Sequence, residues 1–140
     1  MTSEVVPMQY FSKCQSEFKP PLIANENAYL GDVATRYYSP NLPTLSTTLT
    51  RIRSEHNDPE KPIVGGFYRL EKGTPLEYTY TYHEMKIIVE GSFDITDETG
   101  KTVHAVPGDV FYFPKGAKIK FTTEDYGLAF FSGQRKTGGA

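Results

Sequence analysis

The sequence predicts a single all-β domain, built as a sandwich or a closed barrel. From residue 76 onward, short apolar and β-branched stretches recur with glycine, proline or aspartate between them. No long amphipathic helical pattern interrupts this rhythm. Many short strands at even spacing are typical of barrels and sandwiches. A chain of 140 residues has the size of one domain with one core.

The first part of the chain is less regular. Residues 1–30 lack sustained period-2 alternation, which favours loop and a short helical turn. Residues 32–38 predict a short strand that ends before Pro40, and the alternation over 45–53 predicts another, rich in threonine. Residues 54–62 contain the turn residues of a break, and a strand resumes over 63–70. Gly65 and Gly66 within it indicate a bulge or a close backbone approach.

The rest of the chain alternates regularly between strands and turns. The expected strands span residues 76–82, 84–90, 92–96, 101–105, 109–113, 117–122 and 127–131. Glycine-containing turns separate most of them. We therefore expect an N-terminal extension over 1–30 that packs on the barrel, a β-barrel over 31–134 and a flexible, glycine-rich tail over 135–140.

Composition excludes several classes of function. The net charge of −2 and the absence of a basic cluster argue against a nucleic-acid partner. The single cysteine, Cys14, excludes an intrachain disulfide and zinc-finger spacing. Because no apolar run has the length of a signal peptide core or a membrane span, we expect a cytoplasmic protein without a membrane partner.

Two segments resemble the paired motifs of the cupin superfamily. In the first motif a histidine pair precedes a glutamate, which is followed after six residues by a glycine, and Glu84 and Gly91 keep this spacing. In the second, Gly108, Pro114 and Gly116 match. The three histidine positions of the two motifs hold other residues here, namely Tyr78, Tyr80 and Ile119.

Within the cupins, residues 63–131 most resemble the group that includes the ethanolamine-utilisation Q protein. The resemblance implies an RmlC-like jelly roll, the double-stranded β-helix of cupins, and a homodimer. The group is associated with ethanolamine catabolism and an acetate-kinase-like activity. The first 60 residues do not follow its bacterial members, so that activity is not carried over to this chain. Cupins host many chemistries, so the fold alone does not identify a reaction.

Strand geometry groups the candidate site residues. In a strand, every second side chain faces the same side. Aligned on Glu84, one parity would face the barrel interior, and it contains Tyr78, Tyr80, Tyr82, Glu84 and Lys86. A turn or bulge before Glu84 would instead turn Glu77, Thr79 and Thr81 inward. Phenols and one carboxylate are a poor ligand set for a divalent metal, so neither a metal nor another cofactor is expected.

These residue types suit acid–base chemistry on a small molecule. We expect Glu84 to transfer the proton, with Tyr80 and Lys86 as its catalytic partners. The residues expected to bind the substrate are Tyr78, Tyr82, Arg51, Arg53, Arg69, Tyr112 and Ile119. The predicted function is a metal-independent enzyme that acts on a small carbonyl, phenolic or carboxylated metabolite as a lyase, isomerase, cyclase or decarboxylase. Two alternatives stay open: a non-catalytic small-molecule-binding or scaffold cupin, and a metal-dependent oxygenase or decarboxylase with unusual ligands.

Overall fold

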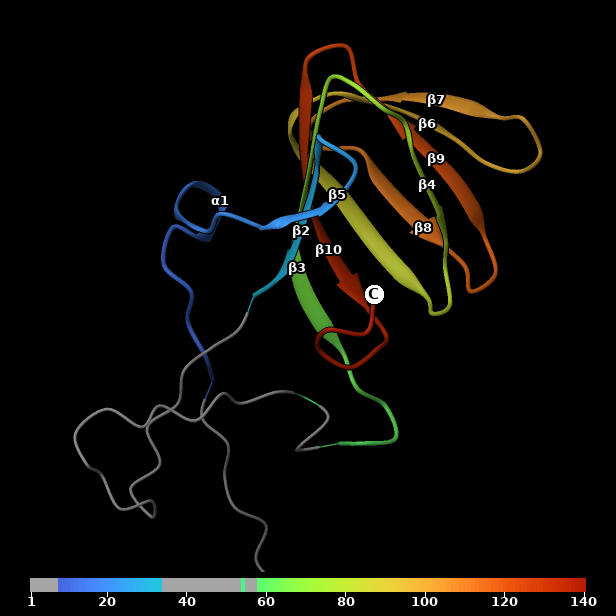
Figure 1. Ribbon diagram of the computed structural model, residues 1–140. Coiled ribbons are helices and arrows are strands. Elements are labelled where there is room, and N and C mark those ends of the chain that lie inside the picture. Colours follow the sequence, from blue (N-terminus) through green and yellow to red (C-terminus); the bar gives the residue numbers. More distant parts are fainter. Residues whose placement is uncertain (1–7, 34–53, 55–57) are drawn as a thin grey trace, which may run out of the picture.

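The computed structural model describes residues 8–33, 54 and 58–140. Within these residues two antiparallel sheets face each other around one apolar core (Figure 1). This arrangement is the all-β jelly roll that the sequence predicts. No helix in the described part of the chain is long and apolar enough to cross a membrane.

Among the described residues, the larger sheet has six strands and the smaller has four. In spatial order the larger sheet contains β1 (Leu22–Ala24), β2 (Ala28–Asp32), β3 (Val64–Glu71), β10 (Tyr126–Gly133), β5 (Glu84–Gly91) and β8 (Val110–Phe113). The smaller contains β4 (Leu76–Thr79), β9 (Lys118–Thr122), β6 (Phe93–Thr96) and β7 (Thr102–Ala105). One short helix, α1 (Cys14–Glu17), precedes the sheets.

The core forms because the strands alternate between inward and outward side chains. β9, for example, buries Ile119 and Phe121 and exposes the lysines beside them. The largest fully buried side chains come from both sheets, and they are Tyr68, Leu70, Ile88, Phe93, Phe121 and Phe131. Each such side chain contributes about 1.5–3 kcal/mol through its burial.

The glycine pair in β3 marks a close backbone approach and not a bulge. The pairing of β3 with both β2 and β10 runs without a shift in register. A Cβ atom on Gly66 would lie 2.2 Å from the carbonyl oxygen of Gly31. Because the neighbouring backbone leaves no room for a side chain there, only glycine fits at this position.

The N-terminal extension differs in part from the expectation. The short helical turn is present as α1, but residues 22–32 form a hairpin that joins the larger sheet through the pairing of β2 with β3. The prediction of loop was wrong for this hairpin, because pairing with β3 stabilises strands too short to show alternation. The strand expected over 32–38 is described only to Val33, and the one over 45–53 lies outside the described residues.

Two residues of the C-terminal segment over 135–140, which the sequence predicts to be flexible, contact Asp32. Arg135 is 6% exposed and forms a bidentate ion pair with Asp32, at 2.8 and 3.0 Å. The backbone N–H of Gly138 also donates to Asp32. These partners are more than 100 positions apart in the chain, so a local pattern could not reveal them.

Candidate active site

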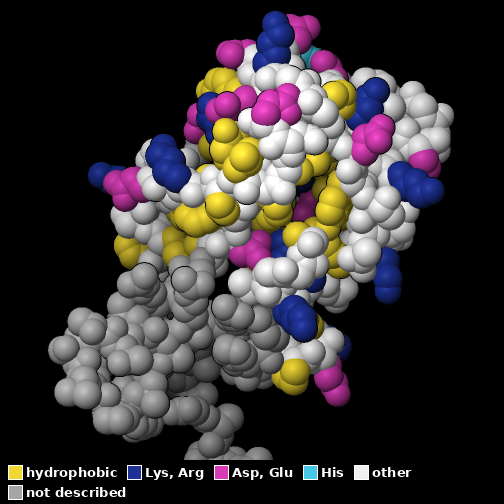
Figure 2. Space-filling view, viewed as in Figure 1, with side chains coloured by type: hydrophobic (Ala, Val, Ile, Leu, Met, Phe, Trp, Pro, Cys, Tyr) yellow, Lys and Arg dark blue, Asp and Glu magenta, His cyan; other side chains and the backbone are white. Residues whose placement is uncertain are grey.

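Five inward-facing side chains, three before β5 and two at its start, form a group that we call the inner cluster. Its members are Tyr78, Tyr80, Tyr82, Glu84 and Lys86. Burial alternates without interruption from residue 77 to residue 88, although a bend separates β4 from β5. The structure therefore has the register that the sequence favoured, and Glu77, Thr79 and Thr81 are exposed. Figure 2 shows a hollow in the face of the molecule, walled by hydrophobic side chains, with acidic and basic atoms visible inside it.

Glu84 is the centre of the inner cluster. The Tyr80 hydroxyl donates to its Oε2 atom at 2.5 Å, and Lys86 Nζ lies 3.2 Å from the same oxygen. Lys86 also donates to the Tyr80 oxygen at 3.4 Å. All three side chains are at most 3% exposed. Oε1 makes no hydrogen bond with any described residue, so one oxygen of a fixed carboxylate has no partner in this part of the chain.

Lys86 is enclosed by aromatic rings. Its Nζ lies 4.7 Å from the ring centroids of both Tyr68 and Phe121, and Phe113 and Phe131 are slightly farther away. Burial lowers the pKa of Lys86, while the charge of Glu84 and the hydrogen bond to it act in the opposite direction. The ring faces offset part of the cost of burying the ammonium group.

The buried phenols of the inner cluster stay protonated over the physiological pH range. Burial, followed by the charge of Glu84 and the hydrogen bond to it, raises the pKa of Tyr80. Burial also raises the pKa of Tyr82, and its interaction with the neighbouring Arg135 acts against this. These two side chains therefore serve as hydrogen-bond donors and not as bases.

The phenol rings pack on one another and on the barrel wall. Tyr78 contacts Tyr80 edge to face at 4.8 Å, and its hydroxyl donates to the Tyr82 oxygen at 3.2 Å. Tyr80 stacks on Phe113 at 5.0 Å with an interplanar angle of 14°. This packing limits the rotamers of the ring that holds Glu84 in place.

The structure assigns the other predicted site residues to different places. Ile119 is buried directly opposite Tyr78. Arg69 and Tyr112 do not join the inner cluster, because their strands turn Tyr68 and Phe113 inward instead. Arg69 pairs with Glu71 at 3.0 Å, at a partly exposed position.

Tyr112 lies on the outer surface, where it hydrogen-bonds His83 Nδ1 at 2.9 Å. His83, expected to face away from Glu84, is on that surface too. Arg51 and Arg53 lie outside the described residues.

Arg135 is the residue that sequence reasoning missed. Its guanidinium carbon lies 5.1 Å from the centroid of the Tyr82 ring, at the outer end of the inner cluster. Burial acts to lower the pKa of Arg135, but its hydrogen bonds with Asp32 and its electrostatic interaction with Tyr82 outweigh this and raise it overall. In the sequence, its polar neighbours Gln134 and Lys136 indicate only a polar C-terminal tail.

The inner cluster does not fit a divalent metal. The positions that hold histidines in the cupin motifs hold two phenols and an isoleucine, and the carboxylate of Glu84 is already paired with an ammonium group. Within the described ranges, no three His, Cys, Asp or Glu side chains gather as metal ligands would. Phenols that burial keeps protonated are poor ligands.

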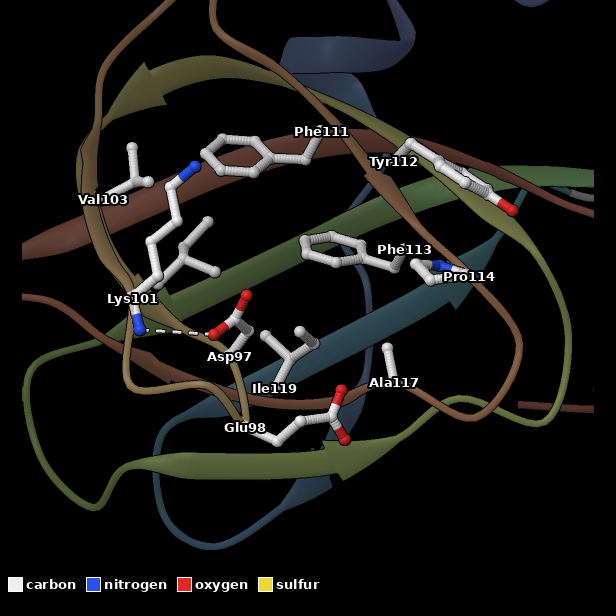
Figure 3. A pocket seen from close by; sticks show the side chains of 11 residues that line it. Asp97, Glu98, Lys101, Val103, Phe111, Tyr112, Phe113, Pro114, Ala117 and Ile119 are labelled. Atoms are coloured by element: carbon white, nitrogen blue, oxygen red, sulfur yellow. Dashed lines mark hydrogen bonds between the residues drawn. The ribbon is translucent and has the colours of Figure 1, made fainter.

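A separate pocket of about 260 Å³ opens between the two sheets, beside the inner cluster. We call it the seam pocket, and Figure 3 shows the carboxylates of Asp97 and Glu98 and the aromatic side chains of Phe111 and Phe113 lining it. The side chain of Tyr112 points away from these rings. Phe113 lines the seam pocket and also stacks on Tyr80, so one ring separates the two sites.

The two facing sheets, with a polar cluster where the motif glutamate lies, define a cupin. Residues 51–132 match the family model described as ethanolamine utilisation protein EutQ. The chain therefore belongs to the EutQ family.

Known relatives agree with this assignment. The protein named acetate kinase EutQ from Clostridioides difficile is 34% identical over 67 residues, which are 48% of this chain and 42% of that protein. The chain thus spans less than half of this curated relative. Its solved Clostridium difficile counterpart superposes with a TM-score of 0.53 at 24% identity, over 76% of this chain and 67% of that one.

Two further solved structures have the same fold. A Salmonella typhimurium ethanolamine utilization protein Q has a TM-score of 0.50 at 20% identity, over 75% of this chain and 96% of that one. A Rhizobium leguminosarum protein of unknown function has a TM-score of 0.56 at 21% identity, over 91% and 97% of the two chains. At these identities the likeness establishes the fold alone.

Proposed function

We propose that this protein is a metal-independent cupin enzyme that transfers a proton at a carbon next to a carbonyl group. The observation that carries the proposal is the state of Glu84. Its Oε2 atom is held by Tyr80 and Lys86, while Oε1 has no partner among the described residues. A fixed carboxylate with one open oxygen is suited to act as a general base.

In the reaction the proton passes from the substrate carbon to Glu84 Oε1, and the C–H electron pair moves into the carbonyl to form an enolate. Return of the proton at another carbon gives an isomerase. Loss of a leaving group from the adjacent carbon gives a lyase. Tyr80 holds the carboxylate in one orientation, and Lys86 balances its charge before the proton arrives.

The name of the Clostridioides difficile relative indicates phosphate transfer to acetate. The inner cluster supports that chemistry less well, because its ammonium group is paired with Glu84 and burial weakens its hold on the proton. A phosphate group needs several unpaired cationic or backbone donors. We therefore base the proposal on proton transfer.

The test is hydrogen–deuterium exchange at the α-carbons of cyclohexanone in D2O, followed by NMR. We expect the wild-type protein to accelerate exchange and Glu84→Gln to reduce the acceleration by about 10²-fold or more. Glu77→Gln, which changes an exposed carboxylate on β4, is the matched control and should accelerate exchange of the ketone as much as the wild type does. Equal exchange by wild type and Glu84→Gln would remove Glu84 from the mechanism.

A second candidate function is binding without turnover. It is favoured by the way Glu84, Lys86 and Tyr80 satisfy one another in a nearly inaccessible place. Such a network stabilises a fold without any chemistry. Under this alternative the wild-type protein binds small molecules but does not accelerate exchange above the rate in buffer.

A further inference from the structure

We propose that Tyr82 and Arg135 bind the carbonyl oxygen of the substrate, and that the substrate is an uncharged carbonyl compound and not a carboxylate or a phosphate. This inference rests on the proposed function and names the substrate class for the same site. It keeps Tyr82 among the residues that bind the substrate and adds Arg135, which sequence reasoning missed.

Most of the phenol O–H groups in the inner cluster already donate a hydrogen bond. Tyr80 donates its proton to Glu84, and Tyr78 donates its proton to Tyr82. The Tyr82 oxygen accepts, and its own O–H has no acceptor among the described residues. Tyr82 is thus the phenol of this group that still has a proton to offer.

Arg135 also has one donor left. Its Nη1 and Nη2 atoms hydrogen-bond Asp32, and Nη1 also reaches the carbonyl oxygen of Lys136. The Nε–H group is buried and has no partner. A buried donor without a partner is unfavourable unless a water or a ligand satisfies it.

These two free donors lie on neighbouring side chains. The guanidinium group of Arg135 lies over the ring of Tyr82, with 5.1 Å between its carbon and the ring centroid. The Tyr82 ring lies 5.6 Å from the ring of Tyr80, whose hydroxyl donates to Glu84, so the proton acceptor lies near the same phenol. An oxygen bound here would therefore lie beside the carboxylate that removes the neighbouring proton.

The charges around the site favour an uncharged ligand. Asp32 neutralises Arg135, and Glu84 neutralises Lys86. A carboxylate or phosphate would bring a full negative charge to a place without an unpaired cation, which is costly in a buried setting. Two donors match the two lone pairs of one carbonyl oxygen. The same donors stabilise the negative charge that develops on that oxygen during enolate formation.

The experiment measures binding and not turnover. Cyclohexanone, cyclohexanecarboxylate and inorganic phosphate are titrated into the 140-residue protein, and saturable chemical-shift changes are followed by NMR. Tyr82→Phe removes the O–H and keeps the ring under Arg135. Arg135→Lys keeps the charge opposite Asp32 and removes the Nε–H. Tyr112→Phe, on the outer surface, is the matched control.

We expect saturable binding of cyclohexanone, with a dissociation constant at least tenfold lower than for the two anions. Tyr82→Phe and Arg135→Lys should each weaken ketone binding about three- to tenfold, as the loss of one hydrogen bond predicts, and Tyr112→Phe should not. No saturable ketone binding, equal binding of either anion, or unchanged affinity in both variants would overturn the inference. Spectra of each variant that match the wild type show that the fold is kept.

The two proposals fail in different ways. Glu84→Gln should bind cyclohexanone like the wild type while it loses exchange. If ketone binding depends on Tyr82 and Arg135 but the wild-type protein does not accelerate exchange, the site for the carbonyl oxygen is supported and the proposed enzymatic activity is refuted. If exchange depends on Glu84 but neither Tyr82→Phe nor Arg135→Lys changes the affinity for the ketone, only the proposed site for the carbonyl oxygen is refuted.

Discussion

Glu84 and Lys86 form an ion pair inside the aromatic core, with 3.2 Å between Oε2 and Nζ and with both side chains at most 3% exposed. One residue separates them and its side chain points the other way, so Glu84 and Lys86 lie on the same face of β5. Removing two charges from water is costly, and their mutual attraction and the hydrogen bond from Tyr80 offset this cost only in part. A buried ion pair is thus weak evidence for stability, which agrees with the proposed acid–base role.

Removing one partner of the ion pair should destabilise the folded protein more than removing both partners. We expect Lys86→Met to lower the free energy of unfolding by about 3–5 kcal/mol at pH 7, because it leaves a buried carboxylate without its partner. The double variant Glu84→Gln, Lys86→Met should recover most of this loss. Urea unfolding of both single variants and the double variant measures the coupling. Additive effects of the two changes would contradict a coupled pair.

Stability should rise with pH because of Lys86. The pKa of Lys86 is lowered in the folded protein from its model-compound value of 10.5, so the unfolded chain binds more protons between the folded pKa and 10.5. The free energy of unfolding should therefore increase with pH in that window, by at most about 1.4 kcal/mol per pH unit.

The pH test compares urea unfolding between pH 7 and 9.5 for the wild type and the double variant Glu84→Gln, Lys86→Met. The upper limit avoids ionisation of tyrosines in the unfolded chain, which acts in the opposite direction because burial raises the pKa of Tyr80 in the fold. A smaller positive slope in the double variant is expected. Identical slopes would exclude Lys86 as the cause.

Tyr80 should act on turnover and not on substrate affinity. Its proton is committed to Glu84, so Tyr80→Phe removes a group that orients the base but does not touch the substrate. We expect the exchange rate at saturating ketone to fall about 10- to 100-fold, with little change in the ketone concentration at half saturation. A change in that concentration alone would assign Tyr80 to substrate binding instead.

The C-terminal anchor should contribute measurably to stability. Arg135→Ala removes the bidentate ion pair with the nearly buried carboxylate of Asp32, and we expect a loss of about 2–4 kcal/mol in urea unfolding. Truncation after residue 134 should cost a similar amount, whereas truncation after residue 138 keeps both contacts to Asp32 and should cost little. A truncation after 134 that unfolds like the full chain would show that the tail is dispensable.

Gly66 should tolerate no side chain. A Cβ there would lie 2.2 Å from the backbone oxygen of Gly31, so Gly66→Ala must separate β2 from β3. We expect a loss of more than about 3 kcal/mol or failure to fold. Gly100→Ala, in an open turn at a φ of +89°, should cost only about 1 kcal/mol. Similar melting temperatures for the two variants would contradict this difference.

The homodimer expected from the cupin resemblance leads to another test. The outer face of the larger sheet has paired apolar rows at its β8 edge, where Val110 and Tyr112 lie opposite Ile87 and Met85. Edge strands with apolar side chains favour pairing. We expect Val110→Lys to convert a wild-type dimer into a monomer in size-exclusion chromatography with light scattering, whereas Ile63→Lys, at an equally exposed position, should not. A monomeric wild type would rule the dimer out.

Local sequence patterns were enough to predict the fold and the facing of the inner cluster. The period-2 alternation continues through the bend between β4 and β5, so the parity counted from Glu84 also predicts the burial of Tyr78, Tyr80 and Tyr82. The spacing of glycines and prolines located the turns, because those residues adopt backbone conformations that others avoid.

Tertiary contacts decided what each of these side chains does. Only the folded chain brings Arg135 over Tyr82, because its anchor, Asp32, lies on a strand at the opposite end of the sequence. Only distances between side chains show that Tyr80 gives its proton to Glu84 and that Tyr82 keeps its own. Periodicity reports which way a side chain points along one strand, whereas hydrogen bonds and charge pairs depend on which strands become neighbours.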